Sequence, residues 1–166
     1  MENIIVCGTV GTGKSSITKK ISKEFKMTYI NDWALFKELG MSKKPSSKLF
    51  SKIIATFLKD KQNIVLDLDM SIMPKDFAKN NINAKVYYIG FVDVLKKELA
   101  QKLYEADVKN MVLATRTAKH LLKCGRTLCK ECKKANLPFH TMCGNREKKI
   151  KEMVEIIKND IKNKTP

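Results

Sequence analysis

Residues 8–15 carry the most specific chemical pattern in the chain. They read Gly-Thr-Val-Gly-Thr-Gly-Lys-Ser and hold three of the seven glycines in the sequence. Glycine permits a tight concave turn in which successive backbone N–H groups point at one phosphate. In the pattern G-x-x-x-x-G-K-[ST], the lysine reaches the β and γ phosphates of a nucleotide and the hydroxyl binds Mg²⁺. The segment therefore predicts a site for a nucleoside triphosphate.

The residues on either side of this loop supply the setting that phosphate binding requires. An apolar run at 3–7 predicts a buried strand, and Ile17, Ile21 and Phe25 predict an amphipathic helix over 14–25. That helix would direct the positive end of its dipole at the same anion. The alternative is a glycine-rich turn between strand and helix that binds nothing. The predicted nucleotide contacts are Gly8, Gly11, Thr12, Gly13, Lys14, Ser15 and Ser16, with Lys14 also catalytic and Ser15 also a metal ligand.

Apolar runs and amphipathic stripes alternate along the rest of the chain. Alternation of this kind indicates parallel strands joined by right-handed crossovers. The expected fold class is α/β, with α/β/α layers around a mostly parallel sheet of roughly five strands. Strands are expected at 3–7, 28–31, 63–68, 86–91 and 137–142. Further helices are expected from Ser46 or Ser47 to 58, from Pro74 to near Asn80, in a continuous or broken stretch from 95 toward Cys124 with Gly125 as its stop, and over 147–161.

Length and composition indicate one globular domain. The 166 residues show no internal repeat, and residues 163–166 have the composition of a tail. We see no run long enough to span a membrane, no targeting segment and no oligomer interface. Five cysteines are an odd count, so reduced thiols in a cytoplasmic protein are expected.

The loop and the order of the elements resemble the P-loop NTPase superfamily, and within it the small nucleotide-kinase-like branch. That branch contains the nucleoside monophosphate kinases and the shikimate-kinase-like enzymes. The resemblance covers nearly the whole chain in element order, although only residues 8–15 form a specific motif. It implies a fold of P-loop kinase type, ATP and Mg²⁺ as cofactors, and phosphoryl transfer to a small acceptor. That acceptor would be a nucleotide or nucleoside, or alternatively another hydroxylated metabolite.

A GTPase is disfavoured by two missing motifs. Asp67 is followed by Leu68, Asp69 and Met70 rather than by the D-x-x-G pattern, and the chain has no N-K-x-D.

Asp67 ends the apolar run at 64–66, where the carboxyl end of a parallel strand faces the ligand crevice. It is similar to the Walker B aspartate of the superfamily, which implies a catalytic role and binding of Mg²⁺ together with Ser15. Asp69 shares a face with Asp67 if the strand continues, and it is a candidate substrate-binding residue or base. The alternative is that both carboxylates are exposed and have no function.

Asp32 and Trp33 follow the second expected strand, so they should lie at the same edge of the sheet. In shikimate-kinase-like enzymes an aspartate there contacts the acceptor hydroxyl, and Asp32 is similar. Residues 33–60 would supply the acceptor-binding segment, with Trp33 stacking on a base. The alternatives are a helix cap for Asp32 and a core position for Trp33.

Residues 116–135 contain seven basic residues and a single acidic one. The family places its arginine-bearing lid at this position in the chain, which implies that Arg116 and Arg126 close over the transferring phosphoryl group. Arginine binds phosphate oxygens with a planar fork, and the chain has only three arginines. The alternative is a solvated basic helix face.

The remaining arginine, Arg146, follows the last expected strand in the turn Cys143-Gly144-Asn145-Arg146. In the family this turn borders the adenine, so Arg146 is predicted to contact the nucleotide. The alternative is an ordinary turn in which Asn145 caps the final helix.

Cys124, Cys129 and Cys132 are spaced C-x4-C-x2-C within the expected lid. Some kinase lids of the family hold a structural zinc, but no clear second pair of ligands is present, so reduced thiols are the favoured interpretation.

The net charge of +16 favours an anionic partner or a lysine-rich soluble surface. It motivates a rival function, a nucleic-acid-associated ATPase or an ATP-regulated binding module, which is less favoured than the kinase.

Overall fold

The structure is a computed structural model that describes residues 1–43, 45–69, 72–106 and 109–163. Its centre is a five-stranded parallel sheet with the strand order β2-β3-β1-β4-β5. The prediction of an α/β fold with a parallel five-stranded sheet is confirmed. The strands are β1 (Ile4–Gly8), β2 (Thr28–Asn31), β3 (Ile64–Asp69), β4 (Lys85–Gly90) and β5 (Phe139–Thr141).

The register of the sheet aligns the carboxyl ends of its first three strands. Asn31 at the end of β2 lies opposite Asp67 of β3, and Gly8 at the end of β1 lies opposite Asp69. Because crossover connections leave from this edge, the loop after β1, the residues after β2 and the last residues of β3 share one rim of the sheet.

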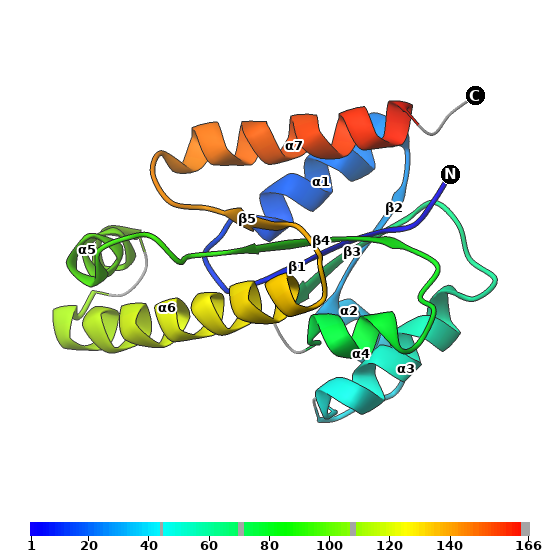
Figure 1. Cartoon of the computed structure of the whole chain (residues 1–166), viewed down its shortest axis with the longest axis horizontal. Helices are drawn as coiled ribbons and strands as arrows, with labels where there is room; N and C mark the ends of the chain where they lie inside the picture. Colours follow the sequence, from blue (N-terminus) through cyan, green and yellow to red (C-terminus); the bar gives the residue numbers. More distant parts are fainter. Residues whose placement is uncertain (44, 70–71, 107–108, 164–166) are drawn as a thin grey trace.

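Helices cover both faces of the sheet (Figure 1). One face packs against α1 (Lys14–Phe25) and α7 (Arg146–Lys162), with Val6, Ile17 and Ile150 among the residues in its core. The other face packs against α3 (Ser47–Leu58), α4 (Pro74–Ala78) and α6 (Met111–Lys134), around Phe50, Leu66 and other buried side chains. The expected three layers are therefore present. Two more helices complete the fold: α2 (Asp32–Glu38), which follows β2, and α5 (Lys96–Ala106), which packs against α6.

Side-chain caps define the starts of four helices but not that of α1. Each cap accepts a hydrogen bond from a backbone N–H in the first turn, a contact that stabilises a helix by about 1 kcal/mol. Helix α1 instead has Gly13 at its N-cap position, where no side chain can accept such a bond. The expected cap at Ser46 and the expected first turn at Pro74 are confirmed. The capping residues are Asn31 for α2, Ser46 for α3, Asn110 for α6 and Asn145 for α7.

The prediction that Gly125 ends a helix is wrong. Helix α6 continues through Gly125 to Lys134. A Cβ atom on Gly125 would lie 2.1 Å from the carbonyl oxygen of Phe91, so glycine is needed because α6 crosses the end of β4 at close range. The helix ends instead at Lys134, and Asn136, two residues further on, has a left-handed φ of 52°. The N–H groups of Asn136 and Leu137 there donate to the carbonyls of Lys133 and Cys132, the pattern of a Schellman motif.

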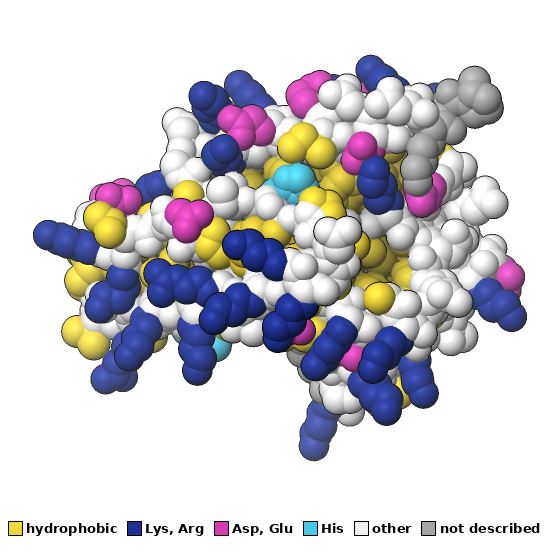
Figure 2. All heavy atoms as spheres, in the orientation of Figure 1, with side chains coloured by type: hydrophobic (Ala, Val, Ile, Leu, Met, Phe, Trp, Pro, Cys, Tyr) yellow, Lys and Arg dark blue, Asp and Glu magenta, His cyan; other side chains and the backbone are white. Residues whose placement is uncertain are grey.

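Charged side chains are unevenly spread over the surface. Lysine and arginine gather along the lower edge of the view in Figure 2, where Figure 1 places α6, α4 and α3. Within the described residues, no helix is both long enough and apolar enough to cross a lipid bilayer.

Candidate active site

The loop between β1 and α1 has the geometry of a phosphate cradle. Gly11 and Gly13 have φ angles of 81° and 90°, which side chains disfavour. The Thr12 hydroxyl donates to the carbonyl of Thr9 at 2.7 Å and holds the turn closed. Helix α1 begins directly after the turn with no side-chain cap and no acidic residue in its first turn. Its N-terminal N–H groups and the positive end of its dipole thus face the loop, as anion binding requires.

Lys14 is buried beneath this loop, with 8% of its side chain exposed. Its Nζ donates to the carbonyl of Thr9 at 3.2 Å and lies 3.4 Å from Oδ1 of Asp69. Burial of a charge is costly unless the charge is paired, so Asp69 supplies the anion that Lys14 needs in this structure. A phosphate oxygen placed in the loop would meet the same requirement.

Ser15 and Asp67 are hydrogen-bonded to each other across the rim. The Ser15 hydroxyl donates to Oδ2 of Asp67 at 2.5 Å, and the Tyr29 hydroxyl donates to the same oxygen at 3.3 Å. Burial, and then the charge of Asp67, raise the pKa of Tyr29, so this phenol stays a protonated donor. Asp67 itself is buried. The pair thus presents two hard oxygen atoms at the mouth of the phosphate loop.

These oxygens fit the donor set that Mg²⁺ takes in nucleotide sites. Mg²⁺ is bound through one or two protein oxygens and fills its remaining positions with water and substrate phosphates. Among the residues that the structure describes, no three His, Cys, Asp or Glu side chains gather around one point. A complete protein cage is therefore absent from this part of the chain, and Ser15 with Asp67 is the arrangement suited to a phosphate-bound ion.

Asp69 lies beside this pair because β3 continues through it. In β3, Leu66 and Leu68 join the core beneath α3 and α6, whereas Val65 joins the core beneath α1. The alternation of a strand therefore places Asp67 and Asp69 together on the α1 face.

The first cavity of the site, which we name the phosphate-loop cavity, is about 280 Å³ in volume. It brings the phosphate loop together with the carboxylates that follow β2 and end β3. Arg146 closes it from the first turn of α7. Nine of the predicted site residues line it: Gly11, Gly13, Lys14, Ser15, Ser16, Asp32, Asp67, Asp69 and Arg146.

A second cavity, which we name the apolar cavity, is about 550 Å³ in volume and shares Gly11 and Arg146 with the first. Lys102 of α5 donates to the carbonyl of Gly144 at 3.0 Å and joins α5 to the turn before α7. Thr12, another predicted contact, lies in its wall. Its apolar lining consists of Phe91, Leu99, Leu103, Ala106 and Met142.

Small kinases are among the solved structures that superpose on the chain. Shikimate kinase from Acinetobacter baumannii superposes with a TM-score of 0.60 at 13% identity, covering 100% of this chain and 96% of that one. A gluconokinase from Sinorhizobium meliloti 1021 gives 0.59 at 14% identity, covering 99% and 98%. Deoxyadenosine kinase from M. mycoides gives 0.51 at 18% identity, covering 97% and 98%. The chain has the small P-loop kinase fold. No protein-family profile and no curated protein sequence matches the chain.

In this P-loop kinase fold, Asp32 and Trp33 open helix α2 beside the phosphate-loop cavity. The helix cap is Asn31, whose side chain accepts from the N–H of Ala34 at 2.8 Å, so the interpretation of Asp32 as the cap is wrong. Trp33 has 81% of its surface exposed, so a core position for it is also wrong. Asp32 lines the cavity, whereas Trp33 does not.

Besides Trp33, three further predicted residues lie outside both cavities. Gly8 is the last residue of β1, and Arg116 and Arg126 are exposed positions on α6. Residues 116–135 are mostly helix α6, whose inner side chains are buried in the core. Residues 107–108, between α5 and α6, lie outside the described part of the chain. The roles of the two arginines and of a lid stay predictions.

The apolar cavity was missed at the sequence level. Leu95, Leu99, Leu103 and Ala106 form a helical stripe that predicts packing against a core. Leu99 does pack against α6, but Leu99, Leu103 and Ala106 also line the open cavity. The position of α5 could have indicated this cavity. The helix directly follows β4 in the chain and lies opposite the turn at 143–146.

The cysteines are free thiols. Cys124 and Cys129 are partly exposed on α6, whereas Cys132 is buried. Burial raises the pKa of both Cys7 and Cys132 to about 12, so these two stay protonated thiols.

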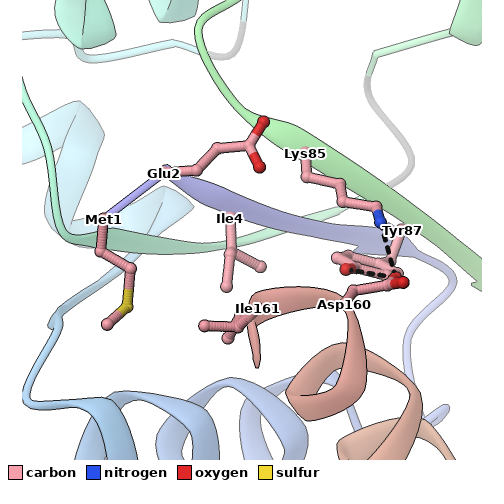
Figure 3. A pocket seen from close by; sticks show the side chains of 7 residues that line it. All are labelled: Met1, Glu2, Ile4, Lys85, Tyr87, Asp160 and Ile161. Carbon is pink, nitrogen blue, oxygen red and sulfur yellow. Dashed lines mark hydrogen bonds and ion pairs between the residues drawn. The ribbon is translucent and has the colours of Figure 1, made fainter. Parts of the chain in front are cut away.

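A third cavity lies at the opposite edge of the sheet, about 370 Å³ in volume (Figure 3). Asp160 accepts from the Tyr87 hydroxyl at 2.8 Å and pairs with Lys85 at 2.7 Å, so these polar groups already bind one another. This cavity is remote from the phosphate loop, because it lies at the amino ends of β1 and β4, whereas the loop follows the carboxyl end of β1.

Proposed function

We propose that the protein is an ATP- and Mg²⁺-dependent phosphotransferase that acts on a hydroxyl group of a nucleoside or nucleotide. One observation carries this proposal: a single cavity holds the phosphate loop, the Ser15–Asp67 pair and two further carboxylates, Asp32 and Asp69. The superposition of shikimate kinase, gluconokinase and deoxyadenosine kinase on the chain supports it.

The donor phosphates would occupy the loop at the start of α1. Lys14 then exchanges its contact with Asp69 for phosphate oxygens, and Arg146 adds charge from the rim of the cavity. Ser15 and Asp67 would hold Mg²⁺, which would supply positive charge beside the donor phosphates. The base of the nucleotide lies in the apolar cavity, because Gly11 and Arg146 line both cavities and connect them.

The acceptor would enter from the side of α2 and meet Asp32 and Asp69. A carboxylate there accepts a hydrogen bond from the acceptor hydroxyl, aligns its oxygen with the γ phosphorus and takes its proton. The new O–P bond forms as the bond between the γ phosphorus and the bridging oxygen breaks, and ADP leaves with the electron pair.

The charge of the phosphate-loop cavity favours an acceptor without an anionic group of its own. Asp32, Asp67 and Asp69 face it, and its two cations, Lys14 and Arg146, lie where the donor phosphates bind. Among the described lining residues, no further cation is present to receive a second phosphate or a carboxylate. A nucleoside therefore fits better than a nucleoside monophosphate, and a neutral hydroxylated metabolite is the second candidate.

An acceptor screen with a coupled assay for ADP tests the proposal. The panel contains nucleosides, their monophosphates, and shikimate and gluconate as acidic hydroxylated metabolites. We expect ADP formation to depend on an acceptor and to be fastest with a nucleoside. ATP hydrolysis that needs no small acceptor and is stimulated by RNA would instead support the rival function, a nucleic-acid-associated ATPase.

A further inference from the structure

The exposed side of α6 carries an unbroken row of cations. Arg116, Lys119, Lys123, Arg126, Lys130 and Lys133 follow one another at alternating intervals of three and four residues, and all six are exposed. Residues at these intervals lie on one face of a helix. The opposite face, with Leu121, Leu128 and Cys132, is buried in the protein. We name these six residues the α6 basic face.

We propose that the α6 basic face binds the phosphate backbone of a nucleic acid. This proposal goes beyond the kinase function and does not depend on it. Arg116 and Arg126 line neither cavity of the candidate active site, so the face is not explained by the contacts there.

The shape of the row fits a linear polyanion better than a small phosphate ligand. From Arg116 to Lys133 it extends for about 25 Å, with a cation roughly every 5 Å, at the 1.5 Å rise of an α-helix. A single phosphate needs cations that converge on one point. A nucleic acid strand instead places a charge about every 3.4 Å along its axis and meets a row of cations along its length.

No carboxylate in the described part of the chain forms an ion pair with the α6 basic face. Among the described residues, none of the six forms an ion pair, and the acidic residue of this region, Glu131, pairs with Lys134 at 2.8 Å. Helix α7 has both kinds of lysine: Lys149 and Lys158 pair with carboxylates at 2.6 and 2.9 Å, whereas its Lys151 and Lys162 form no ion pair with a described residue. The regular spacing of the six cations, rather than the lack of ion pairs alone, sets the α6 basic face apart.

The composition and the surroundings of the face also favour nucleic acid. It holds two of the three arginines in the chain, and arginine binds phosphate oxygens in a bidentate manner. Lys75 of α4 lies close enough to Glu131 to lower the pKa of that carboxyl, although Lys134 has the larger effect. The cationic surface thus continues onto α4, as Figure 2 shows along its lower edge.

A membrane is the less suitable partner. A helix that lies in a bilayer surface buries its apolar face in lipid. The apolar face of α6 already packs against β4, β5 and α5. Met111, Val112 and Leu113 are exposed, but they lie at the first turn of the helix, before the row of cations begins.

The test compares two variants of equal net charge. The first, K119E/K123E/K130E, changes lysines of the α6 basic face and leaves both arginines in place. The control, K20E/K151E/K162E, changes exposed lysines of α1 and α7. Binding is followed by fluorescence anisotropy with single-stranded RNA, single-stranded DNA and duplex DNA of about 20 nucleotides, over a series of salt concentrations. Circular dichroism and thermal unfolding confirm that each variant is folded.

We expect the affinity of the wild type to fall steeply as salt rises. The α6 variant should bind at least about tenfold more weakly, and its plot of log affinity against log salt should have a slope shallower by about two to three units. The control should bind within about threefold of wild type. Equal losses in the two variants would overturn the proposal, because net charge alone would then attract the nucleic acid. Absence of wild-type binding at low salt would also overturn it. So would an α6 variant that loses binding to phosphatidylserine vesicles while its nucleic acid affinity is unchanged.

Discussion

Ser15 and Asp67, which lie 52 positions apart in the chain, are joined by a hydrogen bond of 2.5 Å. The bond exists because β1 and β3 are neighbours in the sheet and α1 starts just beyond the end of β1. The proposed role of the pair is to hold Mg²⁺ against the donor phosphates. We therefore expect Asp67→Asn to lower kcat/KM by about 100-fold or more, because the amide removes a charge where phosphate charge must be balanced.

The matched control for this prediction is Tyr29→Phe. It removes the other donor to the same oxygen of Asp67, at 3.3 Å, and leaves the carboxylate charged. Activity within about threefold of wild type is expected, because one hydrogen bond contributes little in net terms. Titration of activity with Mg²⁺ provides a second readout, and Asp67→Asn should require a higher concentration. Similar kinetics for the two variants would contradict the role of Asp67.

Gly13→Ala should both destabilise the protein and abolish nucleotide binding. The φ of Gly13 is 90°, and an added Cβ would lie 2.8 Å from the side chain of Ile150. We expect a loss of about 1–3 kcal/mol in the free energy of unfolding, measured by urea denaturation, together with loss of ATP binding by calorimetry. The control is Gly40→Ala, where φ is 63° and no atom lies within 4 Å of the new Cβ. That variant should retain ATP binding at wild-type affinity.

Gly125→Ala reverses the usual effect of alanine in a helix. Alanine is favoured over glycine in a helix interior by about 1 kcal/mol. Here the new methyl group would lie 2.1 Å from the carbonyl oxygen of Phe91, so α6 must move away from β4. We expect a net destabilisation of about 1–3 kcal/mol by urea denaturation. A stabilised variant would show that α6 does not approach β4 as closely as described.

The burial of Cys7 and Cys132 predicts that their thiols react slowly and that the stability of the protein depends on pH. Burial raises the pKa of Cys7 and Cys132 to about 12 from 9.0, so these thiols should resist alkylation in the native protein while Cys124, Cys129 and Cys143 react. Mass spectrometry after brief labelling distinguishes the two groups. Because the unfolded chain loses these protons first, stability should fall as pH rises from about 9 toward 12. Cys7→Ala should lessen this fall.

Trp33 offers a direct probe of acceptor binding. It is the one tryptophan in the chain, is 81% exposed and follows Asp32 at the phosphate-loop cavity. Stacking of an acceptor base on the indole would shift its emission to shorter wavelength, because water leaves the ring. We expect this shift with a nucleoside present and not with ATP alone. A spectrum unchanged by every acceptor that is phosphorylated would rule out stacking on Trp33.

The features that depend on local sequence could be predicted. Residues 8–15 specify a turn through their glycines, and the run that ends at Asp67 specifies a buried strand with a carboxylate at its carboxyl end. Parallel order then brings these features to one rim, which the register of β1 and β3 confirms. For the same reason the candidate site could largely be placed before any geometry was known.

The features that depend on packing between distant elements could not be predicted. A glycine such as Gly125 at the end of an amphipathic stretch is typical of a helix end. Only the close contact with the carbonyl of Phe91 shows why α6 continues through a glycine here. Leu99 and Leu103 have the periodicity of core residues and do pack against α6, but they also line the apolar cavity, because α5 lies beside the turn at 143–146. Neither contact has a signature within its own segment of the chain.

The most direct test of the central claim follows the γ-phosphoryl group itself. Wild-type protein is incubated with ATP labelled at the γ position, Mg²⁺ and a nucleoside acceptor, and the label is traced to product or to inorganic phosphate. We predict that the label enters the acceptor, that Lys14→Ala abolishes this transfer without unfolding the protein, and that Lys20→Ala, at an exposed position on the same helix, transfers at the wild-type rate. Transfer by Lys14→Ala at a near-wild-type rate, or label released only as inorganic phosphate by the wild type with every acceptor, would contradict the account.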